Sequence, residues 1–389
     1  MSSALQSLDR VKQHVRAPRP HAEFDLLVAI SSPGLSLDRT LVEDIDWDAL
    51  LIHARHHSLM PLLAHRLLEA GVSLPSSIRA RLRTEFQSNL LRNFGLMEEI
   101  KRILAAWEAA GIEVIPYKGP VMAEQLWGSF ALRECSDLDF LVRREDVERA
   151  GLILADLGYN AVSPIAKSLR PALLRNASEE QFRHSSTNIL LELQWAPAPR
   201  TMAVSYDERQ LWRNSTKAIV AGRTVTAPSP EELLGLLVIH GWKHNWAKLI
   251  WIADVAALIH LNNIDWEQVF HSASRNGWRR ILLLGIAMTR KIYRLTDLPC
   301  DTDEGITALA NDLHEHLPRA TPISYVEWHR DMLRARDCRT HQLRQLRNFV
   351  LSPGLGEYAT VKLPRWASPA YRLIRLGRVL SLWPAKSVE

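Results

Sequence analysis

The stretch "SDLDFLV", from Ser136 to Val142, has two carboxylates at its start and apolar residues at its end. The apolar residues at its end predict a buried β-strand. Because side chains alternate between the two faces of a strand, Asp137 and Asp139 share one face and lie ~7 Å apart along it. Two such charges repel each other, and their burial is costly unless they are paired. The fold must therefore place the start of this strand either at a binding site or in solvent.

A hard divalent cation would resolve this repulsion. Mg²⁺ takes a few carboxylate oxygens together with phosphate oxygens and water. The alternative is a solvated strand end at which one Asp caps the next turn. A third acid, Glu192, lies in the apolar segment "NILLELQWA" and favours the metal interpretation. If the two strands are neighbours, Asp137, Asp139 and Glu192 can hold one or two Mg²⁺ or Mn²⁺ ions. If they are not, Glu192 is an exposed acid on an edge strand.

The composition is typical of a globular protein with room for two or three domains. The chain has 389 residues, of which 47% are hydrophobic and 23% are charged. Three widely spaced cysteines without a CxxC pair argue against a zinc ribbon or a disulfide framework and favour the cytoplasm. The N-terminus lacks the apolar region of a secretory signal, and the apolar runs are far shorter than the ~20 residues of a membrane span. A formal charge of +5 suits anionic ligands such as nucleotides, and we do not expect nucleic acid as a partner.

Hydrophobic periodicity divides the chain into three regions. Residues 1–110 and 228–389 follow the 3.6-residue period of amphipathic helices, whereas residues 111–227 alternate between strands and helices. This order predicts an α+β protein with a small central sheet and helical regions on either side. Among the helices, we expect one over 46–71, capped by Asp46 or Asp48 and ended by Gly71, and one long or two shorter helices over 75–111.

In the middle region, strands are expected at 112–117, 136–142 and 187–196, and a hairpin at 217–229. The next helical region should begin with Ser229 as its N-cap and Pro230 at its first position. At the C-terminus, "YRLIRLGRVLSLW" combines leucines with Arg372, Arg375 and Arg378. This helix either packs on the protein body, which we favour, or lies on an anionic membrane surface.

Together these motifs resemble the bacterial family of uncharacterised nucleotidyltransferases, within the DNA polymerase β-like nucleotidyltransferase superfamily. The resemblance covers about residues 45–360. It rests on a strand that ends in Lys118-Gly119, on the SDxD strand, on the later acidic strand, and on "HGWKHNWAKLIWIAD" from His240 to Asp254. It implies a polymerase β-like core that transfers a nucleotidyl group from an NTP to an acceptor hydroxyl or phosphate with the help of Mg²⁺.

The resemblance also implies roles for the three acids. Asp137 and Asp139 correspond to the first two metal ligands, and Glu192 to the third. Many superfamily members have Asp in place of Glu192, and a His is usual where this chain has Gln194.

The superfamily binds nucleotide phosphates at a glycine pair after its first strand, and two pairs here compete for that role. Lys118-Gly119 ends an expected strand and opens a helix, whose N-terminal N–H groups can bind phosphate. Lys118 adds a phosphate-seeking charge. Gly128-Ser129 instead follows a helical segment, with Ser129 eight residues before Asp137. We therefore take Lys118-Gly119 as the phosphate turn and Gly128-Ser129 as a helix stop.

Further residues are candidates for binding the nucleotide. His240 and His244 share a helix face, but "HGWKH" lacks the glutamate of the zinc-protease motif HExxH. The resemblance implies that their helix lines a substrate cleft opposite the catalytic strands. The alternative is that both histidines are partly buried and hydrogen-bonded to Asp254 or to backbone. Arg133 either clamps a phosphate, forms a salt bridge with Glu134 or has only a surface role. The candidates for nucleotide binding are Lys118, Gly119, Arg133, Ser136, His240, Lys243, His244 and Trp251.

The sequence leaves the acceptor open, with a peptide natural product or a saccharide as possibilities. It also leaves three rival functions. One is a transferase of the same fold that moves a sugar from a nucleotide-sugar to a phosphorylated acceptor. Another is a toxin-like enzyme that modifies tRNA or protein. The last is a non-catalytic module that binds a nucleotide or a partner, against which the intact acidic pair argues.

Overall fold

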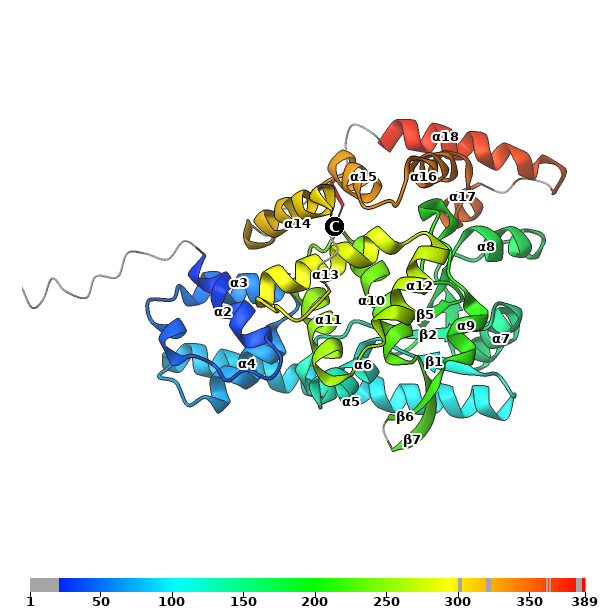
Figure 1. The fold of residues 1–389 in the computed structure, drawn as a ribbon. Helices are drawn as coiled ribbons and strands as arrows, with labels where there is room; N and C mark the ends of the chain where they lie inside the picture. Colours follow the sequence, from blue (N-terminus) through cyan, green and yellow to red (C-terminus); the bar gives the residue numbers. More distant parts are fainter. Residues whose placement is uncertain are drawn as a thin grey trace, which may run out of the picture.

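A computed structural model describes residues 21–220, 222–299, 303–319, 323–361, 363, 365–382 and 387–388. The predicted α+β class is confirmed: a small mixed sheet lies among helices from both ends of the chain (Figure 1). The helices that precede the sheet are α2 (Ala22–Ser31), α3 (Trp47–His56), α4 (Met60–Glu69) and α5 (Ser76–Ala109), with the 3-10 turn η2 (Arg39–Val42).

The single helix expected over 46–71 is wrong, because the structure has two helices there. Asp46 does cap the first, accepting hydrogen bonds from the N–H groups of Asp48 and Ala49 at 3.0 Å. The chain then breaks at Ser58, whose φ of 55° is left-handed, and the next helix begins at Met60 with Pro61 in its first turn. Of the two possibilities for 75–111, the structure has the single long helix α5.

His57 lies at this break and is fully buried. Its Nδ1 accepts a hydrogen bond of 3.2 Å from the N–H of Leu249, so the first turn of α11 (Leu249–Leu261) depends on a neutral ring. Burial, together with the neighbouring His56 and His53, lowers the pKa of His57 to about 3. An unfolded chain would protonate this ring near pH 6.5.

We therefore expect acid to destabilise the protein through His57. The folded pKa is lower than the unfolded one, so the stabilisation is complete above pH 6.5 and is lost as the pH falls toward 3. The loss by pH 5 should be about 1–2 kcal/mol. Urea unfolding at pH 7.5 and pH 5 measures it, and His57→Asn should reduce the difference, because the Asn amide oxygen accepts the same bond without titrating. His271→Gln, at an exposed histidine, is the control. An unchanged pH dependence in His57→Asn would contradict the prediction.

Within the described residues, five strands form the central sheet in the order β1-β2-β5-β4-β3. Strand β5 runs parallel to β2, and the other neighbouring pairs are antiparallel. The strands are β1 (Val114–Pro116), β2 (Asp137–Val142), β3 (Tyr159–Ala161), β4 (Glu179–His184) and β5 (Leu190–Gln194). The connections include α6 (Gly119–Trp127), η3 (Phe130–Leu132), η4 (Arg144–Asp146), α7 (Val147–Asp156), η5 (Lys167–Leu169), α8 (Arg170–Asn176), η6 (Arg200–Met202), α9 (Glu208–Arg213) and the hairpin β6 (Thr216–Val220) to β7 (Arg223–Ala227). The hairpin was predicted, whereas β3 and β4 were not.

The two faces of the sheet differ in character. One face is apolar and packs against the second half of α5 and against α7, with the Trp107 and Phe140 rings edge to face at 5.0 Å between centroids. The residues of β2 and β5 on this face are Leu138, Phe140, Val142, Leu191 and Leu193, all nearly inaccessible. This burial fixes the register of both strands, because a slip of one residue would move the apolar side chains to the other face. The carboxylates must then lie on the opposite face.

The helices after the sheet are α10 (Pro230–Lys243), α11, α12 (Trp266–Asn276), α13 (Arg279–Tyr293), α14 (Glu304–His316), α15 (Tyr325–Arg334), α16 (Arg339–Leu351), α17 (Leu355–Thr360) and α18 (Tyr371–Leu382), with the short turns η7 (Leu317–Arg319) and η8 (Arg365–Ala370) and the strand pair β8 (Ile323–Ser324) and β9 (Ser387–Val388). Ser229 caps α10 and Pro230 begins it, as predicted. Helix α18 packs on the body: Tyr371 and Val379 are buried, and Arg375 contacts Glu357 at 3.3 Å. None of the helices in the described ranges is long and apolar enough to cross a membrane.

The two described cysteines, Cys135 and Cys338, are free thiols, and Cys300 lies outside the described residues.

Candidate active site

The carboxylates lie on the polar face of the sheet, in the first half of β2 and in the middle of β5. The parallel register places Asp139 directly opposite Glu192, and Asp137 opposite Leu190. Paired residues of neighbouring strands share a face, so Asp137, Asp139 and Glu192 project to the same side. The adjacency on which the predicted triad depends is therefore present in the structure.

Asp139 is the most enclosed of these acids, with 6% of its surface exposed. Its Oδ1 accepts hydrogen bonds from Lys118 Nζ at 3.1 Å and from Gln194 Nε2 at 2.8 Å. The same Gln194 amide donates to Glu192 Oε2 at 2.9 Å, and Gln181 Nε2 donates to Glu192 Oε1 at 3.0 Å. Side-chain amides and an ammonium thus hold Asp139 and Glu192 in fixed positions.

The orientation of the Gln194 amide is itself fixed from behind. The buried Tyr117 hydroxyl donates a hydrogen bond to Gln194 Oε1. Burial raises the pKa of Tyr117, so its hydroxyl stays protonated and remains a donor. With its oxygen engaged, Gln194 presents its two N–H donors to the carboxylates of Asp139 and Glu192.

The electrostatics of the cluster favour a further positive charge. Burial raises the pKa of Asp139, the Lys118 ammonium opposes that shift, and the charges of Asp137 and Glu192 add to it. Burial and the charge of Glu192 also raise the pKa of Asp137, although Ser136 Oγ donates to Asp137 Oδ1 at 3.0 Å. The three acids therefore repel one another across this face, and a cation among them would relieve the repulsion.

Lys118-Gly119 lies at the turn from β1 into α6, beside the carboxylates. Gly119 is the first residue of α6 and has a left-handed φ of 58°. A Cβ on Gly119 would lie 3.1 Å from the carbonyl oxygen of Asp137, so the backbone passes the acidic strand closely. By contrast, Gly128 ends α6 in the left-handed conformation, and Ser129 caps η3 by accepting from the N–H of Ala131. Gly128-Ser129 has the geometry of the predicted helix stop.

We expect Gly119→Ala to destabilise the protein more than the same change at another left-handed glycine. Gly71, with φ +63° and nothing near its absent Cβ, provides that reference. Gly71→Ala should lose only the conformational preference, about 1–2 kcal/mol. Gly119→Ala should lose more, since the turn must also shift away from Asp137. Urea unfolding of both variants measures the two losses of stability. Equal losses would show that the Asp137 carbonyl does not restrict the residue at position 119.

Arg133 does not point to open space. Its Nε and a terminal nitrogen contact Asp254 Oδ2 at 3.1 and 3.0 Å, and Trp127 Nε1 donates to Asp254 Oδ1 at 3.0 Å. Two asparagines of α5, Asn89 and Asn93, donate to the Arg133 carbonyl at 3.2 and 2.8 Å. The guanidinium thus ties the segment before β2 to α11, and the structure pairs Arg133 with Asp254 rather than with Glu134.

The histidine segment lies at the C-terminal end of α10 and borders the polar face. Lys243 Nζ is 3.6 Å from Glu179 Oε2. Glu179 lies on β4, directly opposite Gln194 on β5. The rings of His240 and His244 are 4.7 Å apart, and each contacts the ring of Trp251. Asp254 bonds to Arg133 and Trp127, not to these histidines.

The charge state of the two histidines follows from their surroundings. Burial, with help from nearby lysines, lowers the pKa of His244 to about 3 and that of His240 well below its usual value. Both rings are therefore neutral at pH 7. Of the tryptophans in this segment, Trp242 and Trp246 are buried core residues, and Trp251 is partly exposed.

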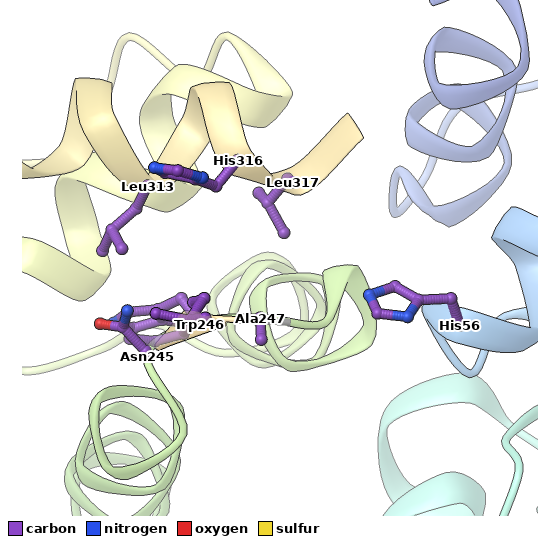
Figure 2. Close-up of a pocket in the computed structure, with 8 residues that line it drawn as sticks. His56, Asn245, Trp246, Ala247, Leu313, His316 and Leu317 are labelled. Atoms are coloured by element: carbon purple, nitrogen blue, oxygen red, sulfur yellow. The ribbon is translucent and has the colours of Figure 1, made fainter. Parts of the chain in front are cut away.

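Two cavities of the described structure lie away from the carboxylates. Figure 2 shows a small one, about 20 Å³, between His56 on one side and Leu313, His316 and Leu317 on the other. It has room for about one water molecule and not for a nucleotide. A larger one of about 450 Å³ lies between α7, the β3–β4 edge and residues 164–170. Its Glu180 and Phe182 are on β4 but on the opposite side of the sheet from Gln181.

Sequence reasoning did not find Gln181, Gln194 and Tyr117 as parts of the site. Gln194 was detectable, because it lies two residues after Glu192 and so shares its face. Tyr117 directly precedes the Lys118-Gly119 turn, which is a weaker signal. Gln181 gave no signal, because its strand, "EEQFRH", is too polar to be predicted as one.

The family assignment follows from a comparison of sequences. The profile of a family described as uncharacterised nucleotidyltransferases matches residues 43–294, which include the sheet, the carboxylates and the histidine segment. The chain belongs to this family. The resemblance inferred from the motifs is thereby confirmed for this nucleotidyltransferase family, and no curated protein matches the chain.

The solved structures that resemble this chain share little of its sequence. They include the antibiotic-resistance factor ANT(2'')-Ia in solution, with 16% identity over 58% of this chain and 100% of that one, at a TM-score of 0.29. A crystal structure of ANT(2'')-Ia with adenylyl-2''-tobramycin has 14% identity over 57% and 98% of the two chains, at a TM-score of 0.27. An antigenic nucleotidyltransferase-like protein from Paracoccidioides brasiliensis has 14% identity over 44% and 84%, at a TM-score of 0.28.

The donor set of the site fits a hard divalent cation. Three carboxylates on one face, each near another, are the oxygen ligands that Mg²⁺ and Mn²⁺ prefer. In the described ranges no three His, Cys, Asp or Glu side chains are already gathered around a common point. The oxygens of Asp139 and Glu192 point instead to Lys118, Gln181 and Gln194. A metal would therefore have to replace some of these donors.

Proposed function

We propose that this protein is a Mg²⁺- or Mn²⁺-dependent nucleotidyltransferase that moves a nucleotidyl group from an NTP to a hydroxyl or phosphate of an acceptor. The observation that carries the proposal is the pairing of Asp139 with Glu192, beside the Lys118-Gly119 turn. Three carboxylates and the Lys118-Gly119 turn thus lie close together at one face of the sheet, which supports the proposal. Asp137, Asp139 and Glu192 would hold the metal.

When bound, the metal would neutralise charge on the phosphates and lower the pKa of the attacking hydroxyl. The residues of the chain do the rest by positioning. The backbone N–H groups at the start of α6 and the Lys118 ammonium would bind the triphosphate. The hydrogen bonds from the Gln181 and Gln194 amides orient the carboxylates of Asp139 and Glu192. The hydrogen bond from Tyr117 fixes the orientation of the Gln194 amide.

In the proposed reaction, an acceptor oxygen attacks the α-phosphorus and its P–O bond forms as the bond to the β-phosphate breaks. Pyrophosphate leaves with the electron pair of that bond, and the acceptor proton is released. This is a phosphoryl transfer, so positioning and charge neutralisation supply the catalysis. The neutral His240 and His244 and the partly exposed Trp251 border this face and are proposed to contact the nucleotide or the acceptor.

The test is incubation of the protein with each α-³²P-labelled NTP, with Mg²⁺ or Mn²⁺, and with pools of saccharides and peptides. Label transfer with equimolar release of pyrophosphate, detected by mass spectrometry of the products and of the protein itself, is the expected result. Saturable binding of nucleotide-sugars without NTP turnover would support the rival sugar transferase. Modification of tRNA or of a protein would support a toxin-like activity. No NTP or metal binding under any condition would refute the proposal.

A further inference from the structure

Lys118 has two possible partners, and the structure shows it with one of them. Its Nζ lies 3.1 Å from Asp139 Oδ1, with 14% of the Lys118 side chain and 4% of the Asp139 side chain exposed. The ammonium thus sits where a cation is needed among the carboxylates. Yet Lys118 is also the residue that precedes Gly119 at the N-terminal end of α6, where phosphate would bind.

Other nearby cations have partners of their own. Lys243 lies against Glu179 and Arg133 against Asp254. The Lys118 ammonium is enclosed beside the buried carboxylate of Asp139, so little water could replace a lost counter-charge. Lys118 therefore always needs an anion close by.

We propose that Lys118 exchanges partners during loading: it pairs with Asp139 in the free protein and with the nucleotide phosphates once a divalent ion occupies the carboxylates. The site then admits a metal–nucleotide complex far better than a metal ion alone. This inference rests on the proposed function and adds to it a coupling between the two ligands.

The physical reason is the cost of an unpaired buried charge. A metal ion that arrives alone must displace the ammonium from Asp139, which leaves Lys118 enclosed without a counter-charge. A triphosphate that arrives with the metal supplies that counter-charge at the same turn. The flexible stem of a lysine allows the movement, whereas the neighbouring Gly119 backbone stays fixed. Because binding free energies are reciprocal, the nucleotide must strengthen metal binding by the same factor as the metal strengthens nucleotide binding.

The test measures Mn²⁺ binding to the full chain by the electron paramagnetic resonance signal of free Mn²⁺, with and without an α,β-methylene NTP analogue. For the wild type, we expect the analogue to strengthen Mn²⁺ binding by about tenfold or more. Lys118→Met should bind Mn²⁺ alone several-fold more tightly than the wild type, and should lose most of the enhancement by the analogue. Lys101→Met, at a lysine of α5 paired with Glu98, removes the same charge elsewhere and should change neither value.

Lys118→Gln provides a second variant, because its amide can still donate to Asp139 without carrying charge, and it should behave like Lys118→Met. Circular dichroism checks that both variants fold. Mn²⁺ binding that is no tighter in either folded variant than in the wild type would overturn the exchange, as would wild-type binding that ignores the analogue. If the wild type binds neither Mn²⁺ nor the analogue, the proposed function fails as well, so the two failures are distinguishable.

Discussion

Asp137→Asn is expected to lower the rate of nucleotidyl transfer by about three orders of magnitude. The variant should be at least as stable as the wild type. Asp137 is a proposed metal ligand whose described side-chain hydrogen bond comes from Ser136 Oγ. Its charge faces two other carboxylates, so a neutral amide of the same shape relieves repulsion in the folded state. A change that removes activity without lowering stability would mark a carboxylate kept for function rather than for folding. Pyrophosphate release and urea unfolding, both at pH 7.5, measure the two effects.

Asp331→Asn is the matched control because it should give the opposite result. Asp331 is also buried, but it lies in α15 and pairs with Arg330 at 3.1 Å and with Arg334 at 3.4 Å. Its loss should lower the free energy of unfolding and leave transfer per folded molecule unchanged. If Asp137→Asn instead retained activity, or lost stability as Asp331→Asn does, the proposed role of Asp137 would be wrong.

The sequence predicts the parts of the site better than their assembly. The alternation of "SDLDFLV" predicts which side chains share a face, and the apolar burial of Phe140 confirms that reasoning. The Lys118-Gly119 turn was also located from the strand before it and from Pro120 after it. These features are local, since each depends on residues within one turn or one strand of its neighbours.

What the sequence could not predict depends on contacts between distant segments. The pairing of Asp139 with Glu192 requires β5 to lie parallel to β2. In the chain, 47 other residues separate Val142 at the end of β2 from Leu190 at the start of β5, and no local pattern specifies the pairing. Strand β4 is held by its backbone pairing with β5 and β3, and its polar sequence does not show the alternation of a half-buried strand. The helix break at Ser58 is likewise imposed by packing, in which His57 meets the start of α11.

The same limit explains Arg133, which the motif presents as a phosphate clamp and the structure joins to Asp254. The Asp254 side chain is 1% exposed and that of Arg133 is 12% exposed, so neither charge can turn to water if its partner is lost. Arg133→Met should therefore destabilise the protein by about 3–5 kcal/mol, measured by urea unfolding. The cause is the uncompensated charge of Asp254, left with Trp127 as its remaining described donor.

A second substitution separates folding from nucleotide binding at this position. If the buried charge is the cause, Arg133→Met combined with Asp254→Leu should recover a large part of the lost stability, because an apolar pair needs no counter-charge. A double variant no more stable than Arg133→Met would contradict this explanation. The affinity of the stable double variant for an NTP analogue then tests whether Arg133 binds phosphate. An affinity equal to that of the wild type would show that Arg133 contributes to folding and not to nucleotide binding. A loss of affinity that persists after stability returns would show that Arg133 also contacts the nucleotide.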